Sequence, residues 1–473
     1  MTASALLGAV LIAIAFPFGD EAPWLMLATP LAGLVVAAVF AKPLLAVFVI
    51  FAAQPLGVAG LPLGLGQLTA VEAAILLVTL LVALRRVGLG KTPLSWSPEL
   101  WWILAFLTWA LIATRSAGDQ VEATKNVVSM TYDLIMVCLV LTVCRTPDDI
   151  RRSFGIFNAA AALVTIPAIA GGSGLQASYG GEVVTGRVAG FFSSPNSLGS
   201  FCALATLVAL GMGFAARSRN GRVASFICLG IQLVGLTLSL SRGAWIGTVA
   251  GIVFLLITLS EVRHAVLPLM AALVVGMIVV ILLAVSATDI QIIEERAETL
   301  RNIDEAGGDR PALWGEALRQ IRADPWTGQG PGNFDIAIQR PASAGLVVTG
   351  GHAHNTFLNI GAEMGLPGVA LFIGFLLAVA RASRKALRQA VSINGRDRAL
   401  MASLCAVLIY VVIHGLVDTI GGNPVNDVGR WAVMGALLVL VHQEKGSGSA
   451  QALVHPRASH VDVFHAAWRG RPS

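Results

Sequence analysis

Long apolar runs separated by short polar segments dominate the chain. A bilayer core about 30 Å thick is crossed by a helix of about 20 apolar residues, or fewer where flanking side chains reach the interface. The pattern predicts helices at residues 3–16, 24–40, 43–53, 68–84, 100–113, 127–144, 154–170, 198–215, 223–240, 244–259, 265–285, 357–380, 399–416 and 431–441. We therefore expect an all-α, polytopic integral membrane bundle of about 12 to 14 transmembrane helices.

The one long polar segment, residues 286–356, has a helical pattern of its own. Pro311 suits the first turn of a helix that ends at Asp324 and Pro325. Its apolar stripe is formed by Leu313, Trp314, Ala317, Leu318 and Ile321. The glycine-rich stretch 328–334 then predicts a tight structural turn, which we favour over a phosphate-binding loop.

These patterns divide the chain into three regions. Residues 1–153 are predicted as N-terminal transmembrane helices, and 154–442 as a transmembrane core that includes the external loop 286–356. Residues 443–473, rich in Gly, Ser, Pro and Arg, are expected to form a disordered cytoplasmic tail. The first apolar run lacks a basic start and a small-residue cleavage site, so we interpret it as a retained helix and not as a signal peptide.

Composition supports a membrane protein and excludes several other classes. With 56% apolar and 12% charged residues, the chain has too little polar surface for a soluble globule. The five cysteines lie in or beside apolar runs and indicate neither a disulfide framework nor a metal site. The net charge of +5 comes from short basic clusters between apolar runs, so we expect membrane lipids and no nucleic acid as partners.

The basic clusters also predict the orientation in the membrane. They fall in alternate connections, at residues 85–91, 145–152, 217–222 and 381–398, which the positive-inside rule places in the cytoplasm. Both termini are then cytoplasmic, and loop 286–356 is external. In a Gram-negative cell this orientation corresponds to an inner-membrane protein with a periplasmic loop.

Four motifs on the predicted external side carry residues suited to chemistry. Arg242 lies in a very short turn between two helices, Arg187 precedes another helix, and Arg310 begins the loop helix. His352 and His354, followed by Asn355, stand where the loop re-enters the bilayer. The alternatives are structural: interfacial or solvated arginines, and polar groups that begin a helix.

Together these residues suggest group transfer from a phosphorylated lipid to an alcohol. Arginine forks match phosphate oxygens bidentately and stay charged. A neutral imidazole can remove a proton from a hydroxyl group. No acidic motif with metal-ligand spacing occurs on the external side, so we expect no metal and no other cofactor.

Five ionisable residues fall inside predicted helices: Glu72, Asp133, Glu363, His414 and Asp418. His414 and Asp418 are four residues apart on one helix face, so they could hydrogen-bond to each other near the outer end of the helix. Ionisable groups at membrane depth start as functional candidates. The alternative, favoured for Glu72, Asp133 and the pair of His414 and Asp418, is a satisfied polar group inside the bundle.

The ordered motifs resemble the O-antigen ligase and polymerase superfamily of membrane glycosyltransferases. The resemblance covers residues 186–418. It rests on Gly-Arg187-Val-Ala-Gly-Phe-Phe-Ser-Ser-Pro-Asn196, Ser-Arg242-Gly-Ala-Trp, Arg310-Pro-Ala-Leu-Trp, Gly328-Gln-Gly-Pro-Gly-Asn-Phe and His354-Asn-Thr-Phe-Leu followed by Glu363-Met-Gly-Leu-Pro-Gly.

This resemblance implies a GT-C-like helical fold, an undecaprenyl-diphosphate-linked oligosaccharide donor, and a metal-independent inverting transfer. The family's loop histidine corresponds to His354, and its diphosphate-binding arginines to Arg242, Arg310 and, less closely, Arg187. The supporting residues are expected to be Asn196, His352, Asn355, Glu363, His414 and Asp418.

The predicted function is glycosyl transfer at the outer face of the inner membrane. We favour a surface polysaccharide polymerase, with an O-antigen ligase that uses a lipid A-core acceptor as the alternative. Other polysaccharide-assembly membrane proteins are candidate partners. The rival class is a lipid-glycan flippase or other transporter, against which stand the absence of an internal sequence repeat and the gathering of charges on one face.

Overall fold

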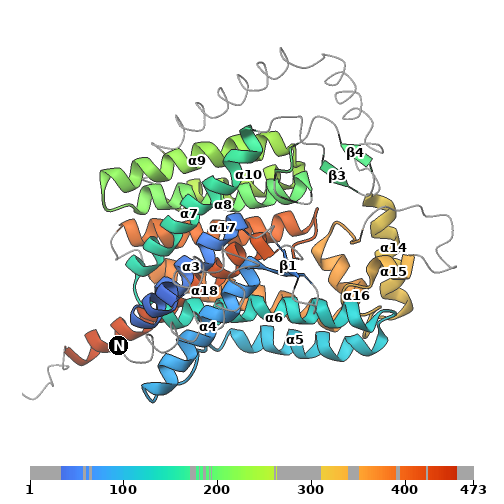
Figure 1. The fold of residues 1–473 in the computed structure, drawn as a ribbon, viewed down its shortest axis with the longest axis horizontal. Helices are drawn as coiled ribbons and strands as arrows, with labels where there is room; N and C mark the ends of the chain where they lie inside the picture. Colours follow the sequence, from blue (N-terminus) through green and yellow to red (C-terminus); the bar gives the residue numbers. More distant parts are fainter. Residues whose placement is uncertain are drawn as a thin grey trace, which may run out of the picture.

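A computed structural model shows a bundle of long helices lying side by side (Figure 1). It describes residues 33–56, 60–62, 67–170, 177–179, 182–184, 188–190, 192, 194–259, 263, 310–338, 351–389, 395–421 and 424–454. Two predicted helices, 3–16 and 265–285, lie outside the described residues, as does most of 24–40.

The described chain consists of helices joined by short turns and two small hairpins. The helices are α3 (Leu45–Ala53), α4 (Ala70–Gly88), α5 (Leu100–Ala113), α6 (Gln120–Val143), α7 (Pro147–Ala170), α8 (Pro195–Ala215), α9 (Arg219–Ser239), α10 (Arg242–Thr258), α14 (Arg310–Ala323), α15 (Phe334–Ile338), α16 (Thr356–Gln389), α17 (Gly395–Gly415) and α18 (Pro424–Val454). The antiparallel hairpins pair β1 (Gly60–Pro62) with β2 (Gln67–Thr69), and β3 (Ala177–Tyr179) with β4 (Glu182–Val184).

Six helices of the described part are long and apolar enough to cross a membrane, namely α6, α7, α8, α9, α16 and α17. Two shorter apolar stretches, Leu100–Ser116 and Arg242–Thr258, accompany them. The predicted polytopic helical membrane bundle is thereby confirmed.

Helix α8 forms the centre of the bundle, with 94% of its apolar 18-residue stretch buried. Small residues let its neighbours approach closely. A Cβ atom added at Gly199 would lie 2.6 Å from the hydroxyl of Ser239 at the end of α9. The hydroxyl of Tyr410 on α17 donates to the carbonyl oxygen of Ser200 at 3.1 Å. Such close contacts and interhelical hydrogen bonds hold helices together where lipid removes the hydrophobic driving force.

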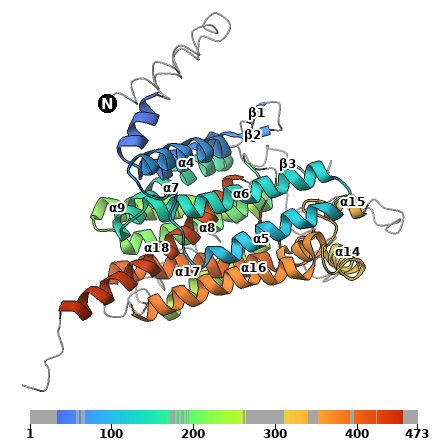
Figure 2. The ribbon, with the colours of Figure 1, turned by 90° about the horizontal axis from the view of Figure 1, so that it is seen from below.

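The two ends of the bundle differ in chemistry. At one end, Arg151 pairs with Asp148 and Asp397, and Arg217 pairs with Asp148 at 2.8 Å. These contacts join the first turns of α7 and α17 and the segment just before α9. Helices α14 and α15 lie at the opposite end, where α16 begins (Figures 1 and 2). The predicted basic loops therefore gather at one end, away from the predicted external loop.

Cysteine labelling checks the orientation. Ala323 at the end of α14 and Asn220 at the start of α9 are both exposed and lie at opposite ends. In a background without reactive native cysteines, we expect an impermeant maleimide to label Ala323→Cys in intact spheroplasts, because that end faces outward. Asn220→Cys should react only after permeabilisation, and the reverse pattern would refute the orientation.

Helix α14 occurs as predicted, but the predicted apolar stripe is partly wrong. Leu313 and Ala317 are buried, whereas Leu318 is 41% exposed. The buried face instead includes Glu316 and Gln320, and Gln320 donates to the carbonyl oxygen of Phe334 at 3.2 Å. Polar side chains can occupy this face because α14 packs against a hydrogen-bonded turn.

The glycine-rich segment after α14 is a structural turn, as expected. Gly328, Gly330 and Gly332 have φ values of 63°, 90° and 69°, which side chains rarely tolerate. The N–H groups of Gln329 and Gly330 donate to the carbonyl oxygens of Ala362 and Glu363 on α16, both at 2.8 Å. Because these two N–H groups already donate to carbonyl oxygens of α16, they cannot bind a phosphate, and the phosphate-loop alternative is excluded for them.

Several predicted helix boundaries need correction. Helix α7 begins at Pro147 and not at residue 154, and α18 begins at Pro424 and not at 431. Apolar windows miss polar first turns, such as Asp148 and Asp149 on α7. Helix α18 also continues to Val454. Glu72 lies in the first turn of α4, where it forms a capping box with Thr69.

Candidate active site

Asn355 starts helix α16, where the chain re-enters the bundle. Its side-chain Oδ1 accepts hydrogen bonds from the backbone N–H groups of Phe357 and Leu358, both at 3.0 Å. Its Nδ2 donates to the carbonyl oxygen of Leu416, just after α17, at 2.9 Å. Asn355 thus satisfies amides that a first helical turn leaves unpaired, and it ties α16 to the end of α17.

Thr356 fastens the same two segments a second time. Its hydroxyl donates to the carbonyl oxygen of Asp418 at 3.1 Å and accepts from the N–H of Ile420 at 2.8 Å. The turn that follows α17 is therefore held against the start of α16. This arrangement brings Asp418 to the loop that carries His352 and His354.

His354 and Asp418 form the central polar contact of this region. Nδ1 of His354 lies 2.9 Å from Oδ1 of Asp418, and the two side chains are 13% and 8% exposed. Burial raises the pKa of Asp418, but the hydrogen bond from His354 and the neighbouring histidines outweigh it and hold this pKa well below its usual range. An ionised carboxylate can only accept, so we assign the hydrogen to Nδ1, which leaves the lone pair of the neutral ring on Nε2.

The backbone of His354 is in an unusual conformation. Its φ of 48° lies in the left-handed region, which is uncommon for residues with a side chain. The flanking residues enforce it: Asn355 caps α16, and the N–H of the buried Ala353 donates to Oδ1 of Asn359 at 2.9 Å. Such enforced conformations concentrate at functional sites.

The suggested side-chain hydrogen bond between His414 and Asp418 is not formed. The backbone N–H of Asp418 does donate to the carbonyl oxygen of His414 at 2.9 Å, but the carboxylate of Asp418 turns to His354. The ring of His414 instead stacks on Tyr410, with centroids 5.3 Å apart. Both ring nitrogens of His414 are buried and have no hydrogen-bond partner among the residues that the structure describes.

His352 packs against His354, with ring centroids 4.3 Å apart. Burial, with the charge of His354 and more weakly that of Arg310, lowers the pKa of His352 to about 4, although Asp418 opposes the shift. His352 is therefore neutral at physiological pH. Leu313, three residues after Arg310 on α14, lies in one buried apolar cluster with Ala353, the residue between the two histidines, so the start of α14 lies beside the histidine pair.

Arg242 is exposed at the first position of α10. The preceding turn is constrained, because Leu240 has a φ of 50° and, with His354, is one of two non-glycine residues with positive φ in the described chain. A Cβ atom added at Gly243 would lie 3.3 Å from the ring of His414. The turn that carries Arg242 therefore packs beside His414.

Two further predicted residues have different outcomes. Asn196, in the first turn of α8, lines a small pocket of about 60 Å³ together with His354, His414 and Asp418. Arg187 lies outside the described residues, so its predicted role stays a prediction.

Arg430 is a member of this pocket that the sequence analysis missed. It is 5% exposed, and it donates to Asp427 at 2.6 Å and to the hydroxyl of Ser200 at 2.8 Å. The sequence contained an indication of this, since an arginine inside an apolar helix is energetically costly and is therefore a candidate functional residue. It was overlooked because the predicted helix began at residue 431, which put Arg430 in a loop.

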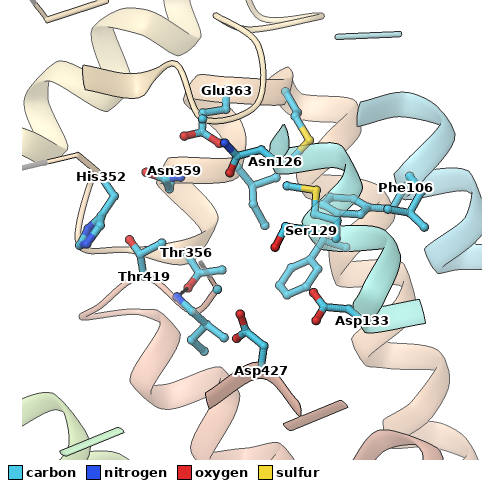
Figure 3. Close-up of a pocket in the computed structure, with 18 of the residues that line it drawn as sticks. Phe106, Asn126, Ser129, Asp133, His352, Thr356, Asn359, Glu363, Thr419 and Asp427 are labelled. Carbon is cyan, nitrogen blue, oxygen red and sulfur yellow. Dashed lines mark hydrogen bonds between the residues drawn. The ribbon is translucent and has the colours of Figure 1, made fainter. Parts of the chain in front are cut away.

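A larger cavity of about 540 Å³ adjoins the small pocket. The two share His352, Thr419 and Gly421 in their walls. Figure 3 shows its labelled polar residues, which come from α6, α16, α18 and the loops beside them: Asn126, Ser129, Asp133, His352, Thr356, Asn359, Glu363, Thr419 and Asp427. His354 and Asp418 therefore stand beside a space large enough for sugar units.

The donor atoms of His352, His354 and Asp418 lie within 4.8 Å of one another and could hold a metal ion. Two imidazoles and a carboxylate are a ligand set that zinc accepts. The same atoms form the hydrogen-bonded pair described above. Metal independence therefore stays a prediction.

Comparison with protein families identifies part of the chain. Residues 224–373 match the O-antigen ligase family. This stretch of the chain is similar to O-antigen ligases. The resemblance to the O-antigen ligase and polymerase superfamily is thereby confirmed, and the domain supports glycan transfer of the ligase or polymerase type, with glycan and lipid-linked substrates in general. A comparison with curated proteins gave no match.

The O-antigen ligase match includes Arg242, Arg310 and His354 but ends before Asp418 and Arg430. Those two residues reach the site through α17, α18 and the turn between them. The structure thus adds the carboxylate partner of the candidate base to the matched segment.

Proposed function

We propose that the protein is a glycosyltransferase that moves a glycan from an undecaprenyl-diphosphate carrier to a sugar hydroxyl at the outer face of the inner membrane. The contact between His354 and Asp418, beside a cavity at one end of the bundle, is the observation that carries this proposal. The O-antigen ligase match over residues 224–373 supports it.

In this mechanism Nε2 of His354 takes the proton of the acceptor hydroxyl as that oxygen attacks the anomeric carbon. The new carbon–oxygen bond forms as the bond from the anomeric carbon to the diphosphate oxygen breaks, and the diphosphate leaves with the electron pair. Attack opposite the leaving group inverts the anomeric configuration. Asp418 stabilises the imidazolium that results and fixes the ring orientation, as the carboxylate does in catalytic triads.

The arginines supply the charge that the leaving diphosphate needs. Arg242 and Arg310 both begin helices near the histidines, so their guanidinium groups add to the positive ends of two helix dipoles. Stabilisation of developing negative charge by fixed positive groups can replace a metal ion in this role. We therefore expect transfer to continue in the presence of EDTA.

Transfer by the purified protein tests the proposal. The full chain in lipid nanodiscs receives lipid-linked glycans extracted from a strain that lacks this protein, and formation of a glycosidic bond is measured. Lipid-linked single repeat units accumulating in that strain indicate a polymerase, which we favour, and long lipid-linked chains indicate a ligase. Movement of lipid-linked glycan between leaflets without bond formation would support the transporter instead.

Arg242→Lys tests the diphosphate contact. Lysine keeps the charge but loses the bidentate fork, so transfer should fall by an order of magnitude or more, for a charged hydrogen bond worth about 1.5–3 kcal/mol. Initial rates at matched protein levels measure the effect. Arg322→Lys on the exposed side of α14 is the control and should be unchanged. Full activity of Arg242→Lys would indicate an interfacial arginine without a role in binding.

A further inference from the structure

His352, His354 and Asp418 place three metal-binding groups around one point. One ligand atom from each residue lies within 4.8 Å of those of the other two. The backbone holds these residues in place, because the carbonyl oxygen of Asp418 accepts from the hydroxyl of Thr356, and His354 directly precedes the residue that caps α16. Small rotations of the side chains would therefore bring all three groups onto a single ion.

The types of these ligands favour zinc. Two imidazoles and one carboxylate form a set that zinc binds at bond lengths of about 2.0–2.2 Å. Magnesium and calcium prefer sites built from oxygen ligands. Both histidines are partly exposed, so a small ion from the surrounding water can reach them.

His414 is an independent indication of a ligand in the small pocket that these side chains line. Both of its ring nitrogens are buried and have no hydrogen-bond partner among the residues that the structure describes. Buried polar groups are nearly always paired. The pocket of about 60 Å³ has room for an ion and a water molecule, and a water kept by zinc as its fourth ligand could donate to His414.

The charges around the pocket permit a cation. Arg430 also lines it, but its guanidinium is paired with Asp427 at 2.6 Å. Arg242 and Arg310 are not among the described residues that line the pocket. The carboxylate of Asp418 can therefore attract a divalent ion on the side away from the proposed diphosphate contacts.

Zinc bound to His354 would leave its ring unable to act as a base. A neutral imidazole carries one hydrogen and one lone pair, on different ring nitrogens. Zinc on Nδ1 would take the lone pair there and leave the hydrogen on Nε2, whereas zinc on Nε2 would leave the hydrogen on Nδ1. In neither form can the ring accept the proton of an acceptor hydroxyl.

We propose that His352, His354 and Asp418 form a zinc site whose occupation inhibits the enzyme reversibly. Zinc and the acceptor hydroxyl compete for the same imidazole, so removal of the ion restores the base. Binding of zinc stands on the geometry of the three ligands, whereas inhibition rests on the proposed function. The inference gives His352 a role as a metal ligand.

Zinc binding is measured on the full chain without a histidine tag, in nanodiscs of zwitterionic lipid, by competition with a fluorescent zinc indicator. We expect the native protein to bind zinc with a micromolar or lower dissociation constant. His352→Ala and His354→Ala should each weaken binding by at least about tenfold, since changes to groups that merely support a ligand already cost roughly 10- to 100-fold. Only monodisperse preparations are compared.

His442→Gln is the matched control, because it removes the second histidine–carboxylate contact that the structure describes, at 3.1 Å to Glu99, where no third ligand was found among the described residues. It should leave the affinity for zinc unchanged. In the transfer assay, zinc at about ten times its dissociation constant should slow the native protein by about tenfold, and EDTA should restore the rate. The same concentration of magnesium should have no effect. His352→Ala should resist zinc relative to its own zinc-free rate.

Absence of zinc binding by the native protein, or equal binding by His352→Ala, would overturn the site. Bound zinc that leaves the transfer rate unchanged, or raises it, would overturn the inhibitory role. Zinc binding that depends on His352, in a protein that transfers no glycan with or without the ion, would refute the proposed function and support the zinc site.

Discussion

Asp418→Asn should reduce glycan transfer by about 10³- to 10⁴-fold, the scale at which the corresponding change disables a catalytic triad. The amide of asparagine can donate a hydrogen bond to Nδ1 of His354, which places the ring hydrogen on Nε2. Nε2 then has no lone pair to receive the proton of the acceptor hydroxyl. The shape of the site stays nearly the same, so the loss would come from the wrong tautomer.

Initial rates of transfer for purified Asp418→Asn and native protein measure this effect. The low pKa of Asp418 keeps its carboxylate ionised from about pH 5 upward, so the difference in rate should persist across neutral and alkaline pH. Asp324→Asn, which preserves the cap after α14, is the control. A folded Asp418→Asn protein within tenfold of the native rate would rule out the tautomer role of Asp418.

The stability of the native protein should depend on pH through the carboxylate of Asp418. Because the pKa of Asp418 is lower in the folded chain than in the unfolded one, its contribution to stability is complete above the usual carboxyl pKa of about 4. The contribution is lost as the pH falls through the lowered folded value. At neutral pH the contribution of Asp418 to stability is therefore complete.

Local patterns allowed much of the fold to be predicted. Helix α5 has the predicted bounds, because its apolar run stops at polar residues on both sides. Helix α14 and the glycine turn also occur where the sequence placed them. These features depend on residues close together in the chain, where periodicity and backbone preferences decide the outcome.

The central contact of the site could not be predicted in the same way. Asp418 meets His354 across 64 residues of sequence, through the bonds that Asn355 and Thr356 make to the turn after α17. Helical spacing favoured His414 instead, because nothing local shows that the carboxylate of Asp418 turns to His354. Arg430 depended likewise on where α18 begins. Long-range geometry set by two helix ends thus decided which polar residues came together.

His354→Ala should abolish measurable glycan transfer, with a loss of at least about 10²- to 10⁴-fold, the usual contribution of a general base. Asp418 fixes the tautomer of His354 in which Nε2 can accept a proton. Removal of the His354 ring therefore deletes the proton acceptor and leaves the arginines in place. The variant protein should therefore still bind the lipid-linked donor. Donor binding and transfer are measured on the same purified preparation.

His352→Ala is the matched comparison, since the two rings pack together but His352 makes no contact with the carboxylate of Asp418 among the described hydrogen bonds. This variant should keep a substantial part of the activity, because its ring supports the base without exchanging protons with substrate. Equal loss in both variants would indicate that the histidine pair acts as a packing or metal-binding unit. Transfer by folded His354→Ala at near the native rate would show that another group takes the proton of the acceptor hydroxyl.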